Sequence, residues 1–212
     1  MALSDATAVS ERIQENPVYV EVFKKLFTDS VFTDANKVYA AVSQSIATFE
    51  SSPEFAPFDS KYDRYLRGEY IMTRQEDLGR QFFFSDLINC NSCHLVNLSP
   101  LYKQETFTNY RYHNIGTPTN ISVRKKNGVD IEHSDQGLLD NPSVNDPIHS
   151  GKFKVPTLRN VSVSAPYMHN GVFNDLRTVM LFYSQYLVSN EENQSNPETG
   201  KPWGKPEVEE NI

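Results

Sequence analysis

The sequence has few cysteines, a shortage of basic residues relative to acidic ones, and no long hydrophobic run. Two cysteines in 212 residues are too few for a disulfide-stabilised secreted scaffold. With 20 basic and 27 acidic residues the formal net charge is -7, which disfavours binding to nucleic acid. No apolar run approaches the roughly 18 residues that a membrane span needs. Membrane-spanning and disulfide-built classes are therefore excluded, and a nucleic-acid-binding class is disfavoured.

The beginning of the sequence also lacks a recognisable export signal. Residues 1–5 have neither a basic segment nor the start of an apolar one, so they do not form a secretory signal. We therefore expect either a cytoplasmic protein or one whose signal was removed or not cloned. The hydrophobic share of 38% and the aromatic share of 12% are enough for the core of one globular domain.

The sequence has no internal repeat and no sustained alternation of apolar and polar residues of the kind that predicts a strand. Helical patterns with capping residues are frequent. Pro17 in the first turn predicts a helix after Asn16, and Thr73 with Glu76 forms a capping-box pair. Further helices are expected after Thr33, over residues 61–67, and from Asn174 or Asp175, where Leu176, Val179, Met180, Tyr183 and Leu187 share one stripe. The predicted fold class is mostly α.

Two stretches show no helical period. Residues 95–155 are rich in Asn, Asp, Ser, Pro and Gly, and so long an irregular segment is usually functional or organised around another group. Residues 191–212 hold six Glu, two Lys and three Pro, which predicts an extended acidic tail.

Both cysteines belong to one short motif, Cys90-Asn91-Ser92-Cys93-His94, which fits the C-x-x-C-H pattern of covalent haem attachment. Two thiols at this spacing can add to the two vinyl groups of one porphyrin, and the following imidazole can then bind the iron. One turn of chain would thus supply both covalent links and the fifth ligand. A haem would also give the long loops a centre around which to fold.

Other chemistries remain open for the same residues. A C-x-x-C pair can be a redox dithiol or half of a zinc site. Zinc would need further ligands at close spacing, and no second paired motif exists in the sequence. A thioredoxin-like interpretation needs a βαβ context, and the residues before Cys90 predict none.

Segments outside the motif resemble the di-haem cytochrome c peroxidases and their MauG-like relatives. The resemblance lies in N-P-V-Y-V-E-V-F (16–23), S-P-E-F-A-P-F-D-S-K-Y-D-R-Y-L-R-G (52–68), Y-H-N-I-G (112–116), F-K-V-P-T-L-R-N-V (153–161), A-P-Y-M-H-N-G (165–171) and N-P-E-T-G-K-P-W-G (196–204). Family members carry two C-x-x-C-H motifs, one in each domain, and this sequence has one. The resemblance therefore covers the C-terminal haem domain only, and we expect a fragment, a processed form or a split subunit.

The resemblance implies a class I cytochrome c-like domain with a helical lead-in and long irregular loops. We expect this domain over residues 1–190, with the lead-in at 1–75 and the haem-binding core at 76–190, followed by the acidic tail at 191–212.

The resemblance also implies haem ligands and pocket residues. His94 would hold one side of the iron, and Met168 in P-Y-M-H would hold the other, with Met72 and Met180 as rivals. Some MauG-like members use tyrosine, and Tyr167 lies next to Met168. Arg159 suits a haem propionate, although it could equally tie loop carbonyls. The remaining pocket candidates are His113, His169, Asn160 and Lys154.

By the same resemblance, the domain would accept electrons from a small cytochrome c or cupredoxin and pass them to a second haem that reduces hydrogen peroxide. No catalytic residue can be assigned here, because the peroxide site belongs to the other domain. Whether the chain alone is an enzyme stays open, and its own part would be electron transfer. The expected location is the periplasm, and a homodimer is compatible with it.

Calcium is a weaker implication of the resemblance. The family binds calcium between its domains, and the corresponding loop here, His149-Ser150-Gly151, differs from the Thr-x-Pro that the family often has. This difference argues against a calcium site.

Two further functions remain alternatives. One is a stand-alone monohaem electron-transfer or sensor protein. The other, of a different class, is a C-x-x-C thiol-redox or zinc-binding module.

Overall fold

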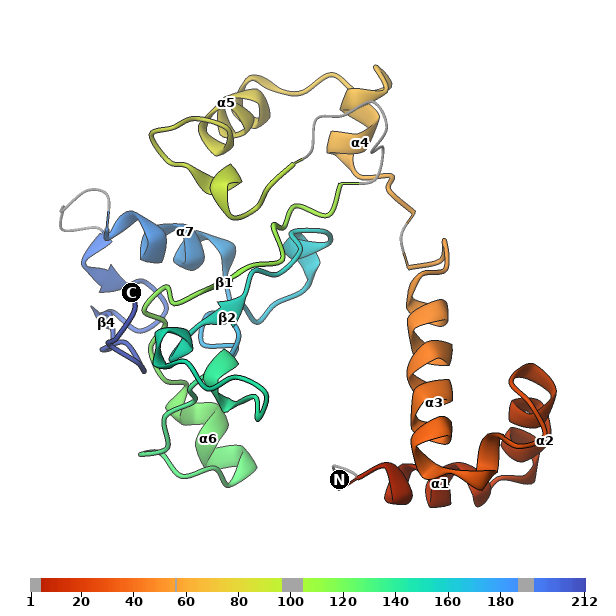
Figure 1. Ribbon diagram of the computed structural model, residues 1–212. Coiled ribbons are helices and arrows are strands. Elements are labelled where there is room, and N and C mark those ends of the chain that lie inside the picture. The colour runs from red at the N-terminus through yellow and green to blue at the C-terminus, as the bar shows by residue number, and fades with distance from the viewer. Residues whose placement is uncertain (1–4, 56, 97–104, 187–192) are drawn as a thin grey trace. The chain divides into compact units, whose positions relative to one another are not determined.

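The computed structural model describes residues 5–55, 57–96, 105–186 and 193–212, and it divides into two compact units, Met1–Ile71 and Met72–Ile212. Helices are the main regular elements of both units (Figure 1), which confirms the predicted mostly-α class. The first unit contains α1 (Ala6–Gln14), α2 (Pro17–Leu26), η1 (Val31–Thr33), α3 (Ala35–Glu50) and α4 (Lys61–Leu66). The second contains α5 (Arg74–Phe83), η2 (Cys90–Ser92), β1 (Tyr112–His113), α6 (Ile121–Asn127), η3 (Leu138–Asp140), η4 (Pro147–His149), β2 (Phe153–Lys154), η5 (Val161–Val163), α7 (Leu176–Ser184), β3 (Ser195–Asn196) and β4 (Lys201–Pro202).

Helix α3 packs against α1 in the first unit, and its buried face is short. Val38 and Ala41 are buried, whereas Ile46 and Phe49 further along the helix are 51% and 60% exposed. The predicted cap at Thr33 is wrong by one residue, because the Asp34 side chain accepts from the Asn36 amide. The Thr33 hydroxyl instead donates to the Ser30 carbonyl and closes the preceding 3-10 turn.

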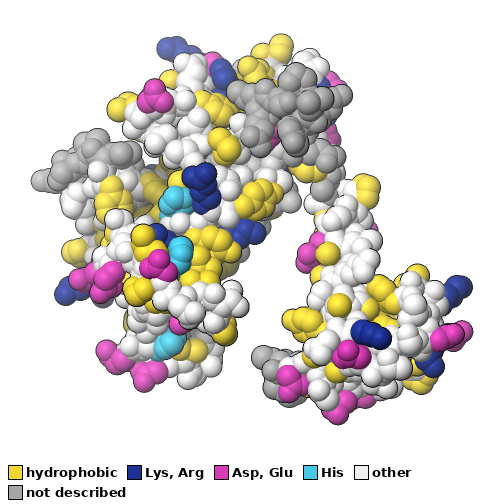
Figure 2. All heavy atoms as spheres, viewed as in Figure 1, with side chains coloured by type: hydrophobic (Ala, Val, Ile, Leu, Met, Phe, Trp, Pro, Cys, Tyr) yellow, Lys and Arg dark blue, Asp and Glu magenta, His cyan; other side chains and the backbone are white. Residues whose placement is uncertain are grey.

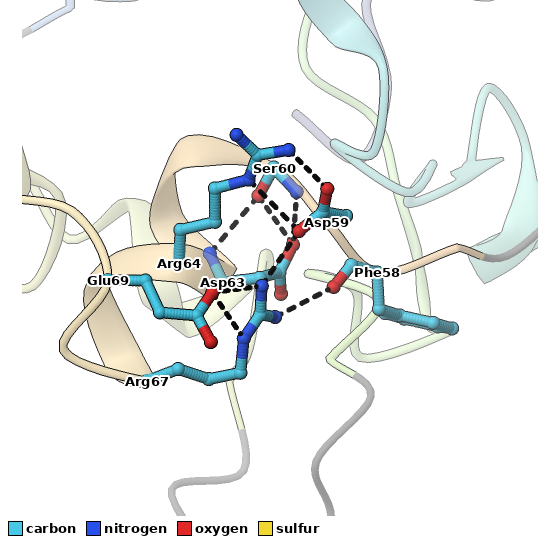
Figure 3. Close-up of polar contacts among 7 residues, drawn as sticks. All are labelled: Phe58, Asp59, Ser60, Asp63, Arg64, Arg67 and Glu69. Carbon is cyan, nitrogen blue, oxygen red and sulfur yellow. Dashed lines mark hydrogen bonds and ion pairs between the residues drawn. The ribbon is translucent and has the colours of Figure 1, made fainter.

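Helix α4 begins with a capping box and is held by a cluster of charged side chains (Figure 3). Ser60 and Asp63 exchange side-chain to backbone hydrogen bonds at its first turn. Arg64 and Arg67 both bind the Asp59 carboxylate, and Arg67 also binds Glu69 at 2.7 Å. Hydrogen bonds from Arg64 and then Arg67 hold the pKa of Asp59 well below its ordinary value, and Arg67 lowers the pKa of Glu69.

Asp59→Asn is expected to loosen α4. The folded-state pKa of Asp59 is lowered, so its contribution to stability is present above the ordinary carboxylate pKa and is lost as pH falls through the depressed value. The substitution removes that contribution at neutral pH. Because the side chains are exposed, high salt should weaken the effect. Hydrogen exchange of the α4 amides at pH 7 should accelerate in the variant and not in the control Glu21→Gln.

Irregular chain makes up much of the second unit, and its core is small. Strand β1 pairs with β2 in antiparallel register, with Tyr112 opposite Lys154 and His113 opposite Phe153. Helix α6 interrupts the stretch for which the sequence showed no period. Among the described residues of this unit, the buried apolar side chains are Val96, Val155, Phe173, Phe182 and Val208. With so few buried apolar side chains, this unit has only a small hydrophobic core of its own.

The predicted acidic tail is packed rather than extended in its described part. Trp203 lies edge-on against Phe173 and Phe182, with ring centroids 5.6 and 5.4 Å apart. Glu207 forms a buried ion pair with Arg124 of α6, and both side chains are at most 10% exposed. Leu187, which the sequence placed on the last helical stripe, and the predicted boundary at residue 190 lie outside the described residues.

Glu207→Ala is expected to destabilise the second unit by about 3–5 kcal/mol, because it leaves the Arg124 charge buried without its carboxylate. It also removes the acceptor of the Asp135 amide. Chemical denaturation followed by circular dichroism measures the change in unfolding free energy. The exposed neighbour Glu209 provides a control, since Glu209→Ala should stay within about 0.5 kcal/mol. A loss no larger than that control would contradict a stabilising role for the pair.

Within the described residues, no helix is both long enough and apolar enough to cross a membrane.

Candidate haem site

The C-x-x-C-H motif folds into a single tight turn at the end of the segment that follows α5. Asn89 takes a left-handed conformation with φ of 56°, and η2 begins directly after it. The His94 amide donates to the Cys90 carbonyl at 2.9 Å, which closes the turn. Cys90 and Cys93 are free cysteines, and both are half-buried. The turn therefore presents two thiols and one imidazole from five consecutive residues.

Backbone contacts with residues 107–109 fix the orientation of the turn and of the imidazole. The Asn109 amide donates to the Cys93 carbonyl at 2.9 Å, and the His94 Nδ1 lies 3.0 Å from the Phe107 carbonyl oxygen. Since a carbonyl only accepts, Nδ1 carries the proton and Nε2 is the basic nitrogen. Metal-binding histidines commonly have this arrangement. Burial lowers the pKa of His94, while the Phe107 and Pro156 carbonyls act in the opposite direction.

The two other chemistries proposed for the cysteines find less support in this geometry. Burial raises the pKa of Cys90, and the neighbouring Cys93 adds to the effect. Reactive dithiols instead have a lowered thiol pKa. Among the described residues, no group of three or more His, Cys, Asp or Glu side chains is arranged to hold a metal ion. Within the described residues, a zinc site would therefore lack ligands beyond the motif.

Tyr183 of helix α7 interacts electrostatically with the two cysteines. The sequence pattern had placed this tyrosine only on a helical stripe. Burial raises the pKa of Tyr183 to about 12, and the Cys93 and Cys90 thiols lie close enough to contribute. Tyr183 as a whole remains 38% exposed. It is therefore the hydroxyl end of the side chain that is shielded from water. A single amphipathic stripe could not distinguish this tyrosine from a core residue.

Several apolar side chains of α5, of α7 and of the segments flanking the motif are exposed, as a surface covered by a haem would require. On the face seen in Figure 2, apolar side chains reach the surface over α5 and α7. A porphyrin is a large flat apolar group, and an exposed apolar surface of this kind normally has a binding partner. The residues that fit a haem by this criterion are Leu78 (49% exposed), Phe82 (46%), Leu87 (74%), Leu95 (41%) and Met180 (53%).

Arg159 contacts the segment that orients His94. Its Nε donates to the Glu105 carbonyl at 2.6 Å, and its guanidinium lies 5.3 Å from the centre of the Phe107 ring. Phe107 is the residue whose carbonyl orients His94. Of the two roles predicted for Arg159, the structure shows the tie to a loop carbonyl, and through Phe107 this tie supports the imidazole.

The other predicted residues gather around Phe153 and the loop that follows η5. The His169 ring stacks on Phe153 with centroids 3.5 Å apart, and His113 lies opposite Phe153 in the strand pair. The Tyr167 hydroxyl donates to the Val161 carbonyl at 2.8 Å. Between Tyr167 and His169, Met168 takes a left-handed conformation with φ of 68°. The contacts of this group thus run to β2 and to η5.

Comparisons with known proteins agree with the motif. A family model described as di-haem cytochrome c peroxidase matches residues 1–70, which nearly coincide with the first unit. The methylamine utilization protein MauG of Paracoccus denitrificans is 46% identical over the whole chain. The family-model match and the 46% identity support the di-haem cytochrome c peroxidase and MauG-like family for this chain. The resemblance inferred from the sequence is thereby confirmed, and the family implies haem c as cofactor.

Further members of the di-haem family are more distant in sequence but similar in structure. The cytochrome-c peroxidase IdrP2 of Denitromonas iodatirespirans is 27% identical over 85% of this chain. The crystal structure of the diheme peroxidase BthA from Burkholderia thailandensis matches 97% of the chain with 26% identity and a TM-score of 0.73. These neighbours confirm the cytochrome c-like fold class. The chain spans about half the length of the relatives it matches, with 54% of MauG and 55% of BthA covered.

Proposed function

We propose that the second unit is a c-type haem electron-transfer domain of a di-haem peroxidase-like protein, with the haem held by Cys90, Cys93 and His94. The observation that carries this proposal is the C-x-x-C-H turn, in which His94 donates from Nδ1 to the Phe107 carbonyl and keeps Nε2 for iron. Each thiol would add across a vinyl double bond, with the sulfur bonded to one carbon and the proton transferred to the other. A haem supplies one-electron redox chemistry when bound.

Protein groups around the turn would hold the imidazole in place and exclude water from it. Arg159 and Phe107 pack behind His94, and the Asn109 amide holds the Cys93 carbonyl. This support would keep the His94 Nε2 pointing in one direction when the charge on a bound metal changes. A ligand with little freedom to move suits electron transfer, because little has to reorganise.

Two side chains are candidates for the position opposite His94. The sequence resemblance favours Met168, and a methionine ligand would raise the reduction potential. The proximity of the Tyr183 hydroxyl to both thiols favours Tyr183. We infer that Tyr183 would be the second ligand, because the Cys93 and Cys90 thiols contribute to its raised pKa and the same helix supplies exposed apolar surface at Met180.

Peroxide reduction would take place on a second haem domain or subunit, as the resemblance implies. A small cytochrome c or cupredoxin would supply the electrons, in the periplasm. Assembly as a homodimer remains a prediction of the resemblance, whereas the His149-Ser150-Gly151 loop argues against a calcium site. The stand-alone monohaem protein is the alternative function, and a thiol or zinc module has less support from the pKa of Cys90 and from the ligand arrangement.

Electron transfer from a reduced donor tests this function directly. Stopped-flow mixing of the ferric holoprotein with a reduced small cytochrome c or cupredoxin should reduce one haem per Cys90–His94 motif. Peroxide should be consumed only when a second haem domain is present. Absence of donor oxidation with both donor classes, or rapid peroxide turnover by the monohaem chain alone, would contradict the proposal.

A further inference from the structure

The described part of the C-terminal segment wraps around α7, and we name residues 193–203 the α7 clasp. Its centre is a hairpin in which β3 pairs with β4, Ser195 lying opposite Pro202 and Asn196 opposite Lys201. The turn is closed by the Gly200 amide, which donates to the Asn196 carbonyl at 2.8 Å. This hairpin gives the clasp a defined shape at the point where it reaches the helix.

At one end of α7 the clasp supplies a carboxylate to the helix N-terminus. The Glu198 Oε1 accepts from the amides of Asn174 at 2.8 Å and Asp175 at 3.0 Å, and Oε2 accepts from the Asn174 side chain at 2.8 Å. A negative charge at this position satisfies free amide donors and interacts favourably with the helix dipole. Although partial burial opposes it, these hydrogen bonds and one from Thr178 lower the pKa of Glu198.

Toward the other end of α7 the clasp holds the last turn and one face. Asn193, which is 3% exposed, donates from Nδ2 to the Ser184 carbonyl at 3.1 Å. Trp203 donates from Nε1 to the Asn193 carbonyl at 2.7 Å and packs its ring edge-on against the fully buried Phe182. The clasp thus contacts both ends of the nine-residue helix and the face between them.

The haem site lies on a different face of the same helix. Successive residues of an α-helix are about 100° apart and 1.5 Å along the axis, since 3.6 residues make one turn. Phe182 packs against Trp203 of the clasp, whereas the next residue, Tyr183, has a pKa that burial and the Cys93 and Cys90 thiols raise. A small rotation or slide of α7 would therefore move the Tyr183 hydroxyl relative to these thiols.

We propose that the α7 clasp sets the position of the haem-facing side of α7, and that Glu198 and Trp203 are positioning residues of the haem site which act through this helix. The inference rests on the proposed haem at Cys90, Cys93 and His94. Loosening the clasp would allow Tyr183 to withdraw and the sixth position to open to added ligands. Neither positioning residue touches the haem or its substrate in this role.

Imidazole binding to the ferric holoprotein tests the proposal, with haem content measured separately by the pyridine haemochrome spectrum. Glu198→Ala removes the carboxylate, Glu198→Gln keeps one carbonyl oxygen at the helix amides, and Trp203→Phe keeps the ring but removes the donor to Asn193. Glu209→Gln is the matched control, since it removes a charge from the same segment at an exposed position. Each protein is studied at a temperature where circular dichroism shows it fully folded.

We expect Glu198→Ala to bind imidazole about fivefold more tightly than the wild type, as the loss of a helix-cap interaction allows. Glu198→Gln should restore part of the wild-type affinity, Trp203→Phe should shift the Soret band, and Glu209→Gln should change neither. Full haem content with unchanged affinity and spectrum in both Glu198→Ala and Trp203→Phe would overturn the clasp's role. If Glu198→Ala does not incorporate haem, the same criteria apply to Glu198→Gln and Trp203→Phe. A wild-type protein without covalent haem would instead overturn the proposed function itself.

Discussion

Replacement of both Cys90 and Cys93 by serine is expected to abolish covalent haem attachment. Serine is close in size to cysteine and preserves the turn, but its hydroxyl does not form a stable bond to a porphyrin vinyl group. Because the His94 amide closes the turn on the Cys90 carbonyl, the backbone geometry does not depend on the sulfur atoms. The variant should retain the circular dichroism spectrum of the folded chain. It should lose essentially all of the haem that stays bound to the chain after denaturation.

The single variants and a neighbouring control sharpen this prediction. Cys90→Ser and Cys93→Ser should each retain one thioether and show a shifted pyridine haemochrome band, because one vinyl group remains unreacted. Asn91→Ala, at an intervening position of the motif, should attach haem as the wild type does. Haem that remains covalently bound in the double variant would contradict the assignment of these cysteines.

Tyr183→Phe is expected to open the sixth coordination position of the ferric haem. Phenylalanine preserves the ring on α7, including its edge contact with Phe182, and removes only the hydroxyl. Azide should then bind readily, and the reduction potential should rise, because an anionic oxygen ligand favours the ferric state. Spectral titration with azide and potentiometric titration measure both changes.

Met168→Ala is the opposing variant for the same question. If Tyr183 is the ligand, Met168→Ala should leave azide affinity and potential close to the wild-type values. If it instead opens the haem and lowers the potential while Tyr183→Phe changes neither, Met168 is the ligand, as the sequence resemblance predicted. The two variants thus separate the candidates, because methionine and tyrosine ligands shift the potential in opposite directions.

Local capping chemistry made several helices predictable from the sequence. Asn16 followed by Pro17 begins α2, and the Thr73 and Glu76 pair forms the capping box of α5, as predicted. Asp175 caps α7 through the Arg177 amide. Each of these signals depends on residues within one helical turn, so a single sequence contains the whole interaction.

Features that depend on distant residues were not predictable in this way. The acidic composition of the last segment indicated a solvated tail, yet Glu207 pairs with Arg124 and Glu198 caps α7. The partner of each carboxylate is more than twenty positions away, and composition alone does not reveal it. Tyr183 was overlooked for the same reason, since only the fold brings it to Cys93.

The candidate haem site depends both on local sequence signals, which could be predicted, and on contacts between distant residues, which could not. The motif itself predicts Cys90, Cys93 and His94 as the haem-binding residues, because two thiols and an imidazole at this spacing suit one porphyrin. The Phe107 carbonyl that orients His94 could not be inferred, because Phe107 lies within the segment 95–155, which has no periodic pattern. The two roles weighed for Arg159 could likewise be compared only once its contact with Glu105 was known.

The central claim is that Cys90 and Cys93 bind one haem covalently, and the mass of the intact chain tests it most directly. The protein should be matured in the periplasm of a host with a cytochrome c assembly system and then denatured in acid before mass spectrometry. We expect a chain heavier by the mass of one haem, with the added mass located on the peptide that contains both cysteines. A chain of unmodified mass, or one that carries zinc and shows no Soret band before denaturation, would contradict this claim.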